Sequence, residues 1–313
     1  MFNIFLPVAD MSINLFLVLG IGGLVGFLSG LFGVGGGFLL TPLMMMIGIP
    51  PAVAAASDSN QIVAAAASGA MAHTRLGNVD MKMGLIILIG GIAGGTVGVQ
   101  VVKVLRQMGN FEFAVKMVYV LMLGGVGSAM FVESLRTLRK KAPTGGQAGD
   151  TAVGQPKFSA FFNRLPLKMH FKKSGLHTSA IFPFTIGAMV GFLAALMGVG
   201  GGFIMVPAMI YIIGMPTVVA IGTDLFQIVF TTANVTLQQA ITNHTVDIVL
   251  ALVLLIGSTV GAQFGARVSK VLKGEQIRIL LSVIVLVMMI KLLFDLLITP
   301  DSLVGFVAAK GGH

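Results

Sequence analysis

Two aspartates lie inside long apolar stretches of this sequence. Asp58 follows Pro50 by eight residues, and Asp224 follows Pro216 by the same spacing. If a membrane-spanning helix begins at each proline, the carboxylates lie about 12 Å along it, close to the midplane of a ~30 Å hydrocarbon core. A charge at that depth is costly and marks a functional site.

Each aspartate has polar neighbours of the same kind. Hydroxyl and amide side chains accompany both carboxylates: Ser57, Asn60 and Gln61 around the first, Thr223 and Gln227 around the second. Each glutamine follows its aspartate by three residues, which places both side chains on one helix face. Two roles stay open for Asp58 and Asp224, namely proton coupling and a structural role in accepting backbone hydrogen bonds. An ionised aspartate repels an anion, so we expect substrate contacts from Ser57, Gln61, Thr223, Gln227 and backbone groups.

The hexapeptide GVGGGF occurs twice, at Gly33–Phe38 and at Gly198–Phe203. Each glycine costs roughly 0.5–1 kcal/mol relative to alanine inside a helix, so four in six residues predict a helix break. Amides freed inside a membrane need partners, and a helix that restarts after the break presents unpaired N–H groups and a positive dipole end. This geometry suits an oxyanion. The predicted substrate-binding glycines are Gly35, Gly36, Gly37, Gly200, Gly201 and Gly202.

Other polar residues are weaker candidates. Asn60, His73, Gln100 and Gln263 are predicted to line a pathway or to bond between helices. The histidines show no metal-ligand spacing and the chain has no cysteine, so neither a metal site nor a cofactor is predicted. A dinucleotide site is excluded because no strand precedes the glycines.

The elements that must position these residues are membrane helices. The chain has 313 residues, of which 56% are hydrophobic and only 10% charged, so a soluble domain is excluded. Several apolar stretches approach the roughly 20 residues that a spanning helix needs. Because alternating strand patterns of a membrane barrel are absent, we predict an all-α polytopic membrane protein.

The net charge of +9 is concentrated in one segment. Between Leu135 and Leu176 there are nine basic residues and a single acidic one, together with a glycine-rich stretch typical of a linker. This pattern favours a cytoplasmic loop that follows the positive-inside rule over a nucleic-acid interface.

Internal repetition organises the rest of the chain. The motif at Gly33 recurs at Gly198, Pro42 recurs as Pro207 at the same offset, and a Thr-Val-Gly-x-Gln stretch near Gly94 recurs near Gly257. We therefore predict two homologous repeats, each with four helical blocks and a broken first helix. The predicted ranges are 11–133 and 178–299 for the repeats, 134–177 for the basic linker and 300–313 for a C-terminal tail. Loop charges favour inverted copies related by a pseudo-two-fold axis, a known transporter plan.

Paired glycine segments leading to proline, each followed by Ser/Thr-Asp, resemble the TauE/SafE family of sulfite exporters and sulfonate permeases. The resemblance covers both repeats. It implies a secondary carrier in the bacterial inner membrane for sulfur oxyanions or small organosulfonates such as sulfite and sulfoacetate. It assigns the site to Gly33–Gly37, Ser57 and Asp58 in one half and to Gly198–Gly202, Thr223 and Asp224 in the other. The long basic loop departs from a minimal carrier, and oligomeric state stays open.

Two alternatives compete with an anion carrier. A cation or metal transporter would use Asp58 and Asp224 with backbone carbonyls. An intramembrane hydrolase would use Ser57 or Ser59 with His73, but the sixteen residues from Ser57 to His73 span about 24 Å on one helix, too far for a hydrogen bond. We therefore predict no enzyme activity. The expected partners are a small anion and the lipid bilayer, without nucleic acid, and a homo-oligomer stays open.

Overall fold

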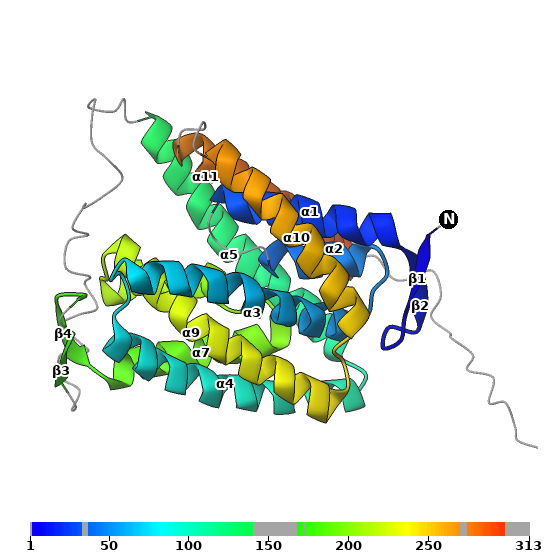
Figure 1. Ribbon diagram of the computed structural model, residues 1–313, viewed down its shortest axis with the longest axis horizontal. Helices are drawn as coiled ribbons and strands as arrows, with labels where there is room; N and C mark the ends of the chain where they lie inside the picture. Colours follow the sequence, from blue (N-terminus) through cyan, green and yellow to red (C-terminus); the bar gives the residue numbers. More distant parts are fainter. Residues whose placement is uncertain (1, 33–36, 140–167, 172, 270–273, 298–313) are drawn as a thin grey trace, which may run out of the picture.

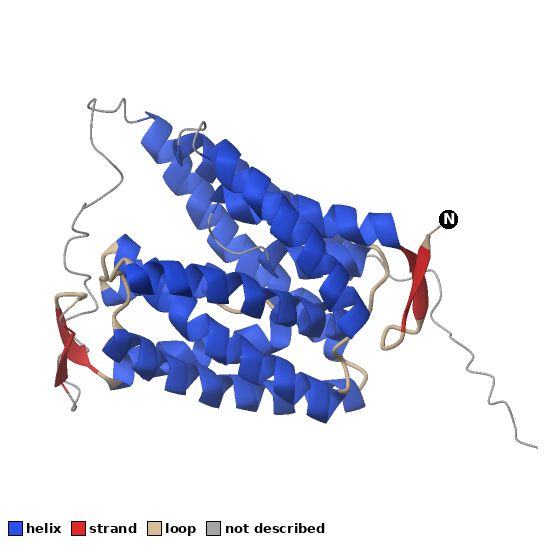
Figure 2. Cartoon of the chain, in the orientation of Figure 1, coloured by secondary structure: helices blue, strands red, loops and turns tan. Residues whose placement is uncertain are grey.

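The computed structural model describes residues 2–32, 37–139, 168–171, 173–269 and 274–297. Most of the described chain is helical, as Figure 2 shows. The helices of the first half are α1 (Leu15–Phe32), α2 (Gly37–Met46), α3 (Pro51–Arg75), α4 (Met81–Gln107) and α5 (Phe111–Arg139). Those of the second half are α7 (Ile181–Met197), α8 (Gly202–Pro207), the π-helix η1 (Ala208–Ile213), α9 (Thr217–Gln238), the π-helix η2 (Gln239–Asn243), α10 (Ile248–Ser269) and α11 (Gly274–Leu297).

Two antiparallel β-hairpins interrupt the helical pattern. Strands β1 (Asn3–Leu6) and β2 (Met11–Asn14) precede α1, while β3 (Lys168–Phe171) and β4 (Leu176–Ser179) precede α7. The hairpins lie at opposite ends of the helix bundle (Figure 1). Neither was expected from the sequence, and the second crosses the predicted boundary between the linker 134–177 and the repeat 178–299. The rest of that linker and the predicted tail 300–313 lie outside the described residues, apart from the last turns of α5.

The helices of the two halves are interleaved. Helix α1 packs along α10, α4 along α7, α3 along α9 and α5 along α11, so each of these contacts joins one half to the other. Glycines permit the closest approaches: a methyl group built on Gly26 would collide with the Ser258 carbonyl oxygen, and one on Gly191 with that of Gly91. Small residues at helix crossings favour association where lipid removes the hydrophobic driving force.

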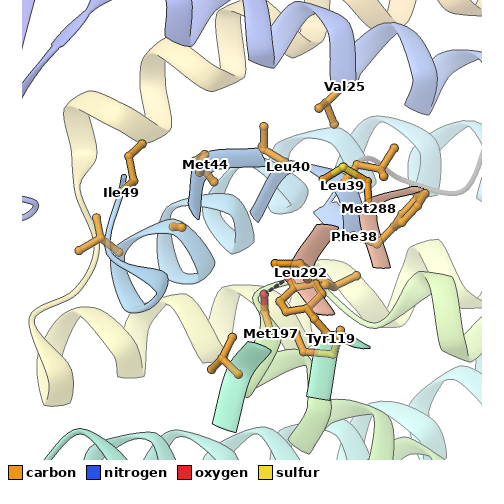
Figure 3. Close-up of a cluster of buried hydrophobic side chains, with 14 of the residues drawn as sticks. Val25, Phe38, Leu39, Leu40, Met44, Ile49, Tyr119, Met197, Met288 and Leu292 are labelled. Carbon is orange, nitrogen blue, oxygen red and sulfur yellow. Dashed lines mark hydrogen bonds between the residues drawn. The ribbon is translucent and has the colours of Figure 1, made fainter. Parts of the chain in front are cut away.

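A buried apolar cluster surrounds the second helix of the first half. Figure 3 shows Phe38 and Leu39 of α2 among side chains from other helices, including Tyr119 of α5 and Leu292 of α11. The cluster is continuous with Met197 at the end of α7. The segment after the first glycine motif is therefore packed inside protein, where an irregular backbone is tolerated at membrane depth.

Candidate functional site

The second glycine segment separates two helices. Helix α7 ends at Met197, and α8 begins at Gly202. Gly198, Gly200 and Gly201 have φ values of +74°, +71° and +87°, a backbone conformation that side chains with a Cβ rarely adopt. The glycines thus supply the turn that redirects the chain. In the first copy, Gly35 and Gly36 lie outside the described residues, and α2 begins at Gly37.

The two glycine segments meet inside the bundle. The rings of Phe38 and Phe203 stack with centroids 4.5 Å apart and planes 11° from parallel, and both side chains are buried. A methyl group built on Gly37 would lie 3.2 Å from the Cα of Val199. Two segments that are far apart in the sequence are therefore in direct contact.

Carbonyl groups at the second break have side-chain partners. The Tyr119 hydroxyl, carried by α5, donates to the Met197 carbonyl at 2.5 Å (Figure 3). Ser59 of α3 donates to the Gly198 carbonyl at 3.3 Å and to that of Ala55 at 3.0 Å. Backbone groups released by a break in an apolar environment must be satisfied, and here neighbouring helices supply the donors.

Asp58 lies beside the first glycine segment. Its side chain is fully buried, and its Oδ2 accepts a hydrogen bond of 2.9 Å from the Thr41 hydroxyl of α2. The same oxygen would lie 3.2 Å from a methyl group on Gly37, which places the carboxylate against the start of α2. Among the described residues, its other oxygen, Oδ1, has no hydrogen-bond partner, and neither does the Oε1 of Gln61 one turn along α3.

Asp224 has a different environment. Its Oδ1 accepts a hydrogen bond of 2.9 Å from the Gln227 amide, and the Oε1 of Gln227 accepts one of 2.9 Å from the Thr231 hydroxyl. All three side chains are buried on α9. Spacings of three and four residues place them along one face of the helix, so the polar groups satisfy one another.

Ser57 and Thr223 connect α3 and α9 to helices of the opposite half. The Ser57 hydroxyl accepts a hydrogen bond of 3.3 Å from the backbone N–H of Asp247, just before α10. The Thr223 hydroxyl accepts one of 3.0 Å from the backbone N–H of Asp80, just before α4. Both hydroxyls are fully buried, and each retains a proton that it can donate.

The aspartates in these two contacts also hold the hairpins. Asp80 caps α4 through the N–H of Met83 and accepts hydrogen bonds from the N–H and hydroxyl of Ser174 in the β3–β4 turn. Asp247 accepts from the N–H of Leu250 in α10 and from the N–H of Val8 in the β1–β2 turn. We refer to Thr223–Asp80–Ser174 and Ser57–Asp247–Val8 as the two latches. Sequence reasoning missed Asp80 and Asp247, although an aspartate immediately before an apolar helix is a typical N-cap signal.

The remaining candidates are dispersed. Asn60 is half-buried on α3, and His73 is half-buried in the last turn of that helix, where it packs against Gly222 of α9. Gln100 and Gln263 are exposed, on α4 and α10 respectively. Among the residues that the structure describes, no group of three His, Cys, Asp or Glu side chains could hold a metal ion.

Comparison with known proteins decides the family. The sulfite exporter TauE/SafE family matches residues 18–292, which include both glycine segments and both buried aspartates. The chain belongs to the TauE/SafE family.

Bacterial relatives agree with this TauE/SafE assignment. The chain is 25% identical over 294 residues to a Bacillus subtilis (strain 168) protein described as "Probable membrane transporter protein YunE", with 91% of this chain and 98% of the relative covered. It is 29% identical over 257 residues to a "Probable membrane transporter protein" of Xylella fastidiosa (strain 9a5c), with 80% and 84% covered. No solved structure matches the chain.

The helices fit a TauE/SafE membrane transporter. Five helices within the described ranges are long and apolar enough to cross a membrane: Met81–Gln107, Phe111–Ser128, Thr217–Asn243, Ile248–Gly265 and Ile279–Leu297. Shorter apolar segments lie in α1, α2 and α7. The protein is therefore a multi-pass membrane protein of a transporter family.

Proposed function

We propose that this protein is a secondary transporter of sulfur oxyanions or small organosulfonates of the sulfite and sulfoacetate type. The observation that carries the proposal is the meeting of the two glycine segments, marked by the stacked rings of Phe38 and Phe203. A site between two helix breaks presents backbone amides from both halves of the chain. Such amides bind an oxyanion without the desolvation cost of a buried lysine or arginine.

The proposed anion site combines backbone and side-chain donors. Helix α2 begins at Gly37 and α8 at Gly202, and α8 continues into η1 to give one helical stretch from Gly202 to Ile213. The proposed amide donors are those of Gly35–Gly37 and Gly200–Gly202, of which Gly35 and Gly36 lie outside the described residues. Ser57, Gln61, Thr223 and Gln227 complete the site in this proposal, with one proton left on each hydroxyl to reach the anion. Asn60 and His73 lie further along α3, where they would contact the anion on its path.

We propose further that the two halves are inverted repeats. The hairpins support this because the offset from β1 to β3, and from β2 to β4, equals the offset between the two GVGGGF motifs. Both hairpin turns also contain a residue of positive φ at that offset, Asp10 and Gly175. Since the equivalent hairpins lie at opposite ends of the bundle (Figure 1), the repeats would run in opposite senses across the membrane. The repeats would then start near Asn3 and Lys168, earlier than the sequence-based limits of 11 and 178.

The glycine contacts support the same relation with one adjustment. Gly22 of α1 meets Leu254 of α10, while Gly187 of α7 meets Ile87 of α4. These two contacts are equivalent in the repeat if Ile87 corresponds to Leu254. The number of residues from Ile87 to Leu254 equals the number from Asp80 to Asp247, the aspartates of the two latches.

This register differs from the one that sequence identity suggests. The glycine contacts define one alignment of α4 with α10. The Thr-Val-Gly-x-Gln stretches of the two helices align only if one helix is moved by one helical turn from that alignment. In this proposal Gln263 is therefore equivalent to Thr96 rather than to Gln100.

The orientation follows from the charge distribution. We infer that the basic segment 134–177 lies on the cytoplasmic side of a bacterial inner membrane, because lysine and arginine accumulate in cytoplasmic loops. The β3–β4 hairpin then faces the cytoplasm, and the β1–β2 hairpin faces the opposite side.

A glycine substitution tests the proposed anion site. Gly201→Leu forces a β-carbon into a backbone of φ +87°, with Val190 only 2.6 Å from it, and removes the turn that exposes the amides. We expect sulfite efflux from loaded proteoliposomes to fall at least tenfold. Gly20→Leu on α1 is the matched control, because a β-carbon there meets nothing within 4 Å. Retained efflux in a correctly inserted Gly201→Leu protein would refute the site.

A ligand screen identifies the substrate class. The purified protein is heated with sulfite, sulfoacetate, taurine, sulfate or thiosulfate, and its melting temperature is recorded. A ligand at about 100 times its Kd stabilises the folded state by about 2.7 kcal/mol. Stabilisation by a sulfur anion that Gly201→Leu abolishes would support the proposal, and stabilisation by none of them would contradict it.

A further inference from the structure

The two buried aspartates differ in how their oxygens are satisfied. Asp224 accepts through Oδ1 at the end of a chain of hydrogen bonds in which Thr231 donates to Gln227 and Gln227 donates to Asp224. Asp58 accepts from the Thr41 hydroxyl through Oδ2, and its buried Oδ1 has no hydrogen-bond partner in the part of the chain that the structure describes. The same holds for the buried Oε1 of Gln61.

Sequence differences between the halves explain this asymmetry. At the position that corresponds to Thr231 of α9, α3 carries Ala65, which has no hydroxyl to donate to Gln61. At the position that corresponds to Thr41 of α2, the second half carries Val206. The first half therefore lacks the donor that orients the glutamine amide toward the carboxylate, and Thr41 donates to the Asp58 carboxylate instead.

The unpartnered atoms are both acceptors. Asp58 is 0% exposed and Gln61 6%, and their spacing of three residues places them on one face of α3. A buried acceptor without a donor carries a desolvation penalty, which is largest for a carboxylate. A cation within reach of both oxygens would remove that penalty.

The surroundings of Asp58 hold no compensating positive charge. Within the described residues, α2, α7 and α8 carry no titratable side chain. Helix α9 contributes Asp224, α5 places Tyr119 close to Asp58, and Asp247 precedes α10 at its contact with Ser57. None of these described neighbours carries a positive charge.

We propose that Asp58 and Gln61 form the binding site for a coupling cation, a proton or Na⁺, and that Asp224 forms no Na⁺ site. The inference rests on the proposed anion transport and assigns its ion coupling to one half only. The Oδ2 of Asp58 lies against Gly37, so a cation at this site adjoins the first glycine segment. Its charge offsets that of an anion bound at the helix breaks, and the pair crosses the low-dielectric region at lower cost than either ion alone.

Cation binding is measured first on its own, without an anion. The melting temperature of the purified full-length protein is recorded while NaCl replaces choline chloride at constant ionic strength, and separately between pH 8 and pH 5. A rise with Na⁺ identifies sodium as the ligand, and a rise on acidification that Asp58→Asn loses identifies the proton. We expect Asp58→Asn to lose the rise, because an amide takes up no proton and lacks the negative charge that holds Na⁺. Asp224→Asn is the matched control and should keep the rise with Na⁺.

A second pair of variants guards against misfolding of Asp58→Asn. Ala65→Thr places a hydroxyl four residues after Gln61, the spacing at which Thr231 donates to Gln227, so that Gln61 can gain the donor that it lacks. We expect it to raise the cation concentration needed for half of the stabilisation about tenfold. Thr231→Ala changes the same chemistry around Asp224 and should leave that concentration unchanged.

The transport arm separates this inference from the proposed function. Sulfite flux into proteoliposomes is compared with and without a pH or Na⁺ gradient. We expect Asp58→Asn to lose gradient-driven accumulation while sulfite exchange at equilibrium continues. If the wild-type protein showed no sulfite flux, the proposed function would be contradicted. The melting-temperature measurement, which uses no anion, would still decide whether the cation site exists. The cation site would be refuted by a wild type insensitive to both Na⁺ and pH, or by an equal loss in Asp58→Asn and Asp224→Asn.

Discussion

At the scale of residues, the break between α7 and α8 depends on side chains from other helices. Glycines make the turn, but Tyr119 and Ser59 satisfy carbonyl groups at its start. Tyr119 is fully buried, so its hydroxyl has no access to water as an alternative partner. The break is therefore held in one conformation by donors that are remote in the sequence.

Removal of the tyrosine hydroxyl tests this role. Tyr119→Phe leaves the Met197 carbonyl without its donor, and a buried polar group left unsatisfied costs about 1–3 kcal/mol. We expect a lower midpoint in denaturant unfolding and a weaker anion response, because the break loses its fixed geometry. Met117→Leu, an exposed change on the same helix, is the control. If Tyr119→Phe were as stable as this control, the hydroxyl would contribute little to the break.

At the scale of elements, each latch joins a surface hairpin to a helix that carries a buried aspartate. Asp80 and Asp247 each cap a helix, hold a hairpin turn and donate a backbone N–H to the residue before Asp224 or Asp58. A movement of either hairpin is thereby connected to the centre of the bundle by hydrogen bonds. Such connections position α3 and α9 against the ends of α10 and α4.

The latches predict similar costs for equivalent substitutions. Asp80→Ala removes the cap of α4 and the acceptor for Ser174, and Asp247→Ala removes the cap of α10 and the acceptor for Val8. Loss of an N-cap alone costs about 1 kcal/mol, so each variant should lose roughly 2 kcal/mol of unfolding free energy in detergent.

A surface charge provides the comparison for both latch variants. Glu112→Ala breaks an exposed pair with Lys116, which is worth about 0–1 kcal/mol. If Asp80→Ala and Asp247→Ala were no more costly than Glu112→Ala, the latches would not be structural connections.

At the scale of the whole molecule, the proposed inversion places the two hairpins on opposite sides of the membrane. The chain has no cysteine, so single cysteines report accessibility without background. Ser12→Cys and His177→Cys occupy exposed, equivalent positions in the two hairpins. With a membrane-impermeant thiol reagent, we expect Ser12→Cys to be labelled in intact cells and His177→Cys only after lysis.

The labelling pattern distinguishes inverted from parallel repeats. Labelling of both cysteines from one side would contradict the inversion, since equivalent hairpins would then share a face. The opposite assignment of sides would preserve the inversion and overturn only the cytoplasmic placement of the basic segment.

Much of this architecture could be predicted from composition and repetition. Apolar stretches of spanning length lead to membrane helices, because every backbone group in lipid must be bonded within the segment. The recurrence of GVGGGF and of the buried aspartates indicated two related halves and a family resemblance, and the family was confirmed. These features are local, so spacing and residue type are sufficient to recognise them.

Other features could be decided only by the tertiary structure. The hairpins are short strands whose partner contacts, Val8 with Asp247 and Ser174 with Asp80, join residues far apart in the chain. In the proposed repeat, the glycine contacts pair α4 with α10 one helical turn away from the alignment of the Thr-Val-Gly stretches, because packing sets the helix register. The unequal satisfaction of Asp58 and Asp224 likewise depends on which donor lies within hydrogen-bonding distance.

The sequence by itself determined the membrane helices, the repeated glycines and the buried charges, because each is a property of a short segment. The tertiary structure decided which helices of the two halves pack together and that the Oδ1 of Asp58 lacks a hydrogen-bond partner among the described residues. Both depend on contacts between distant segments, which no single segment specifies.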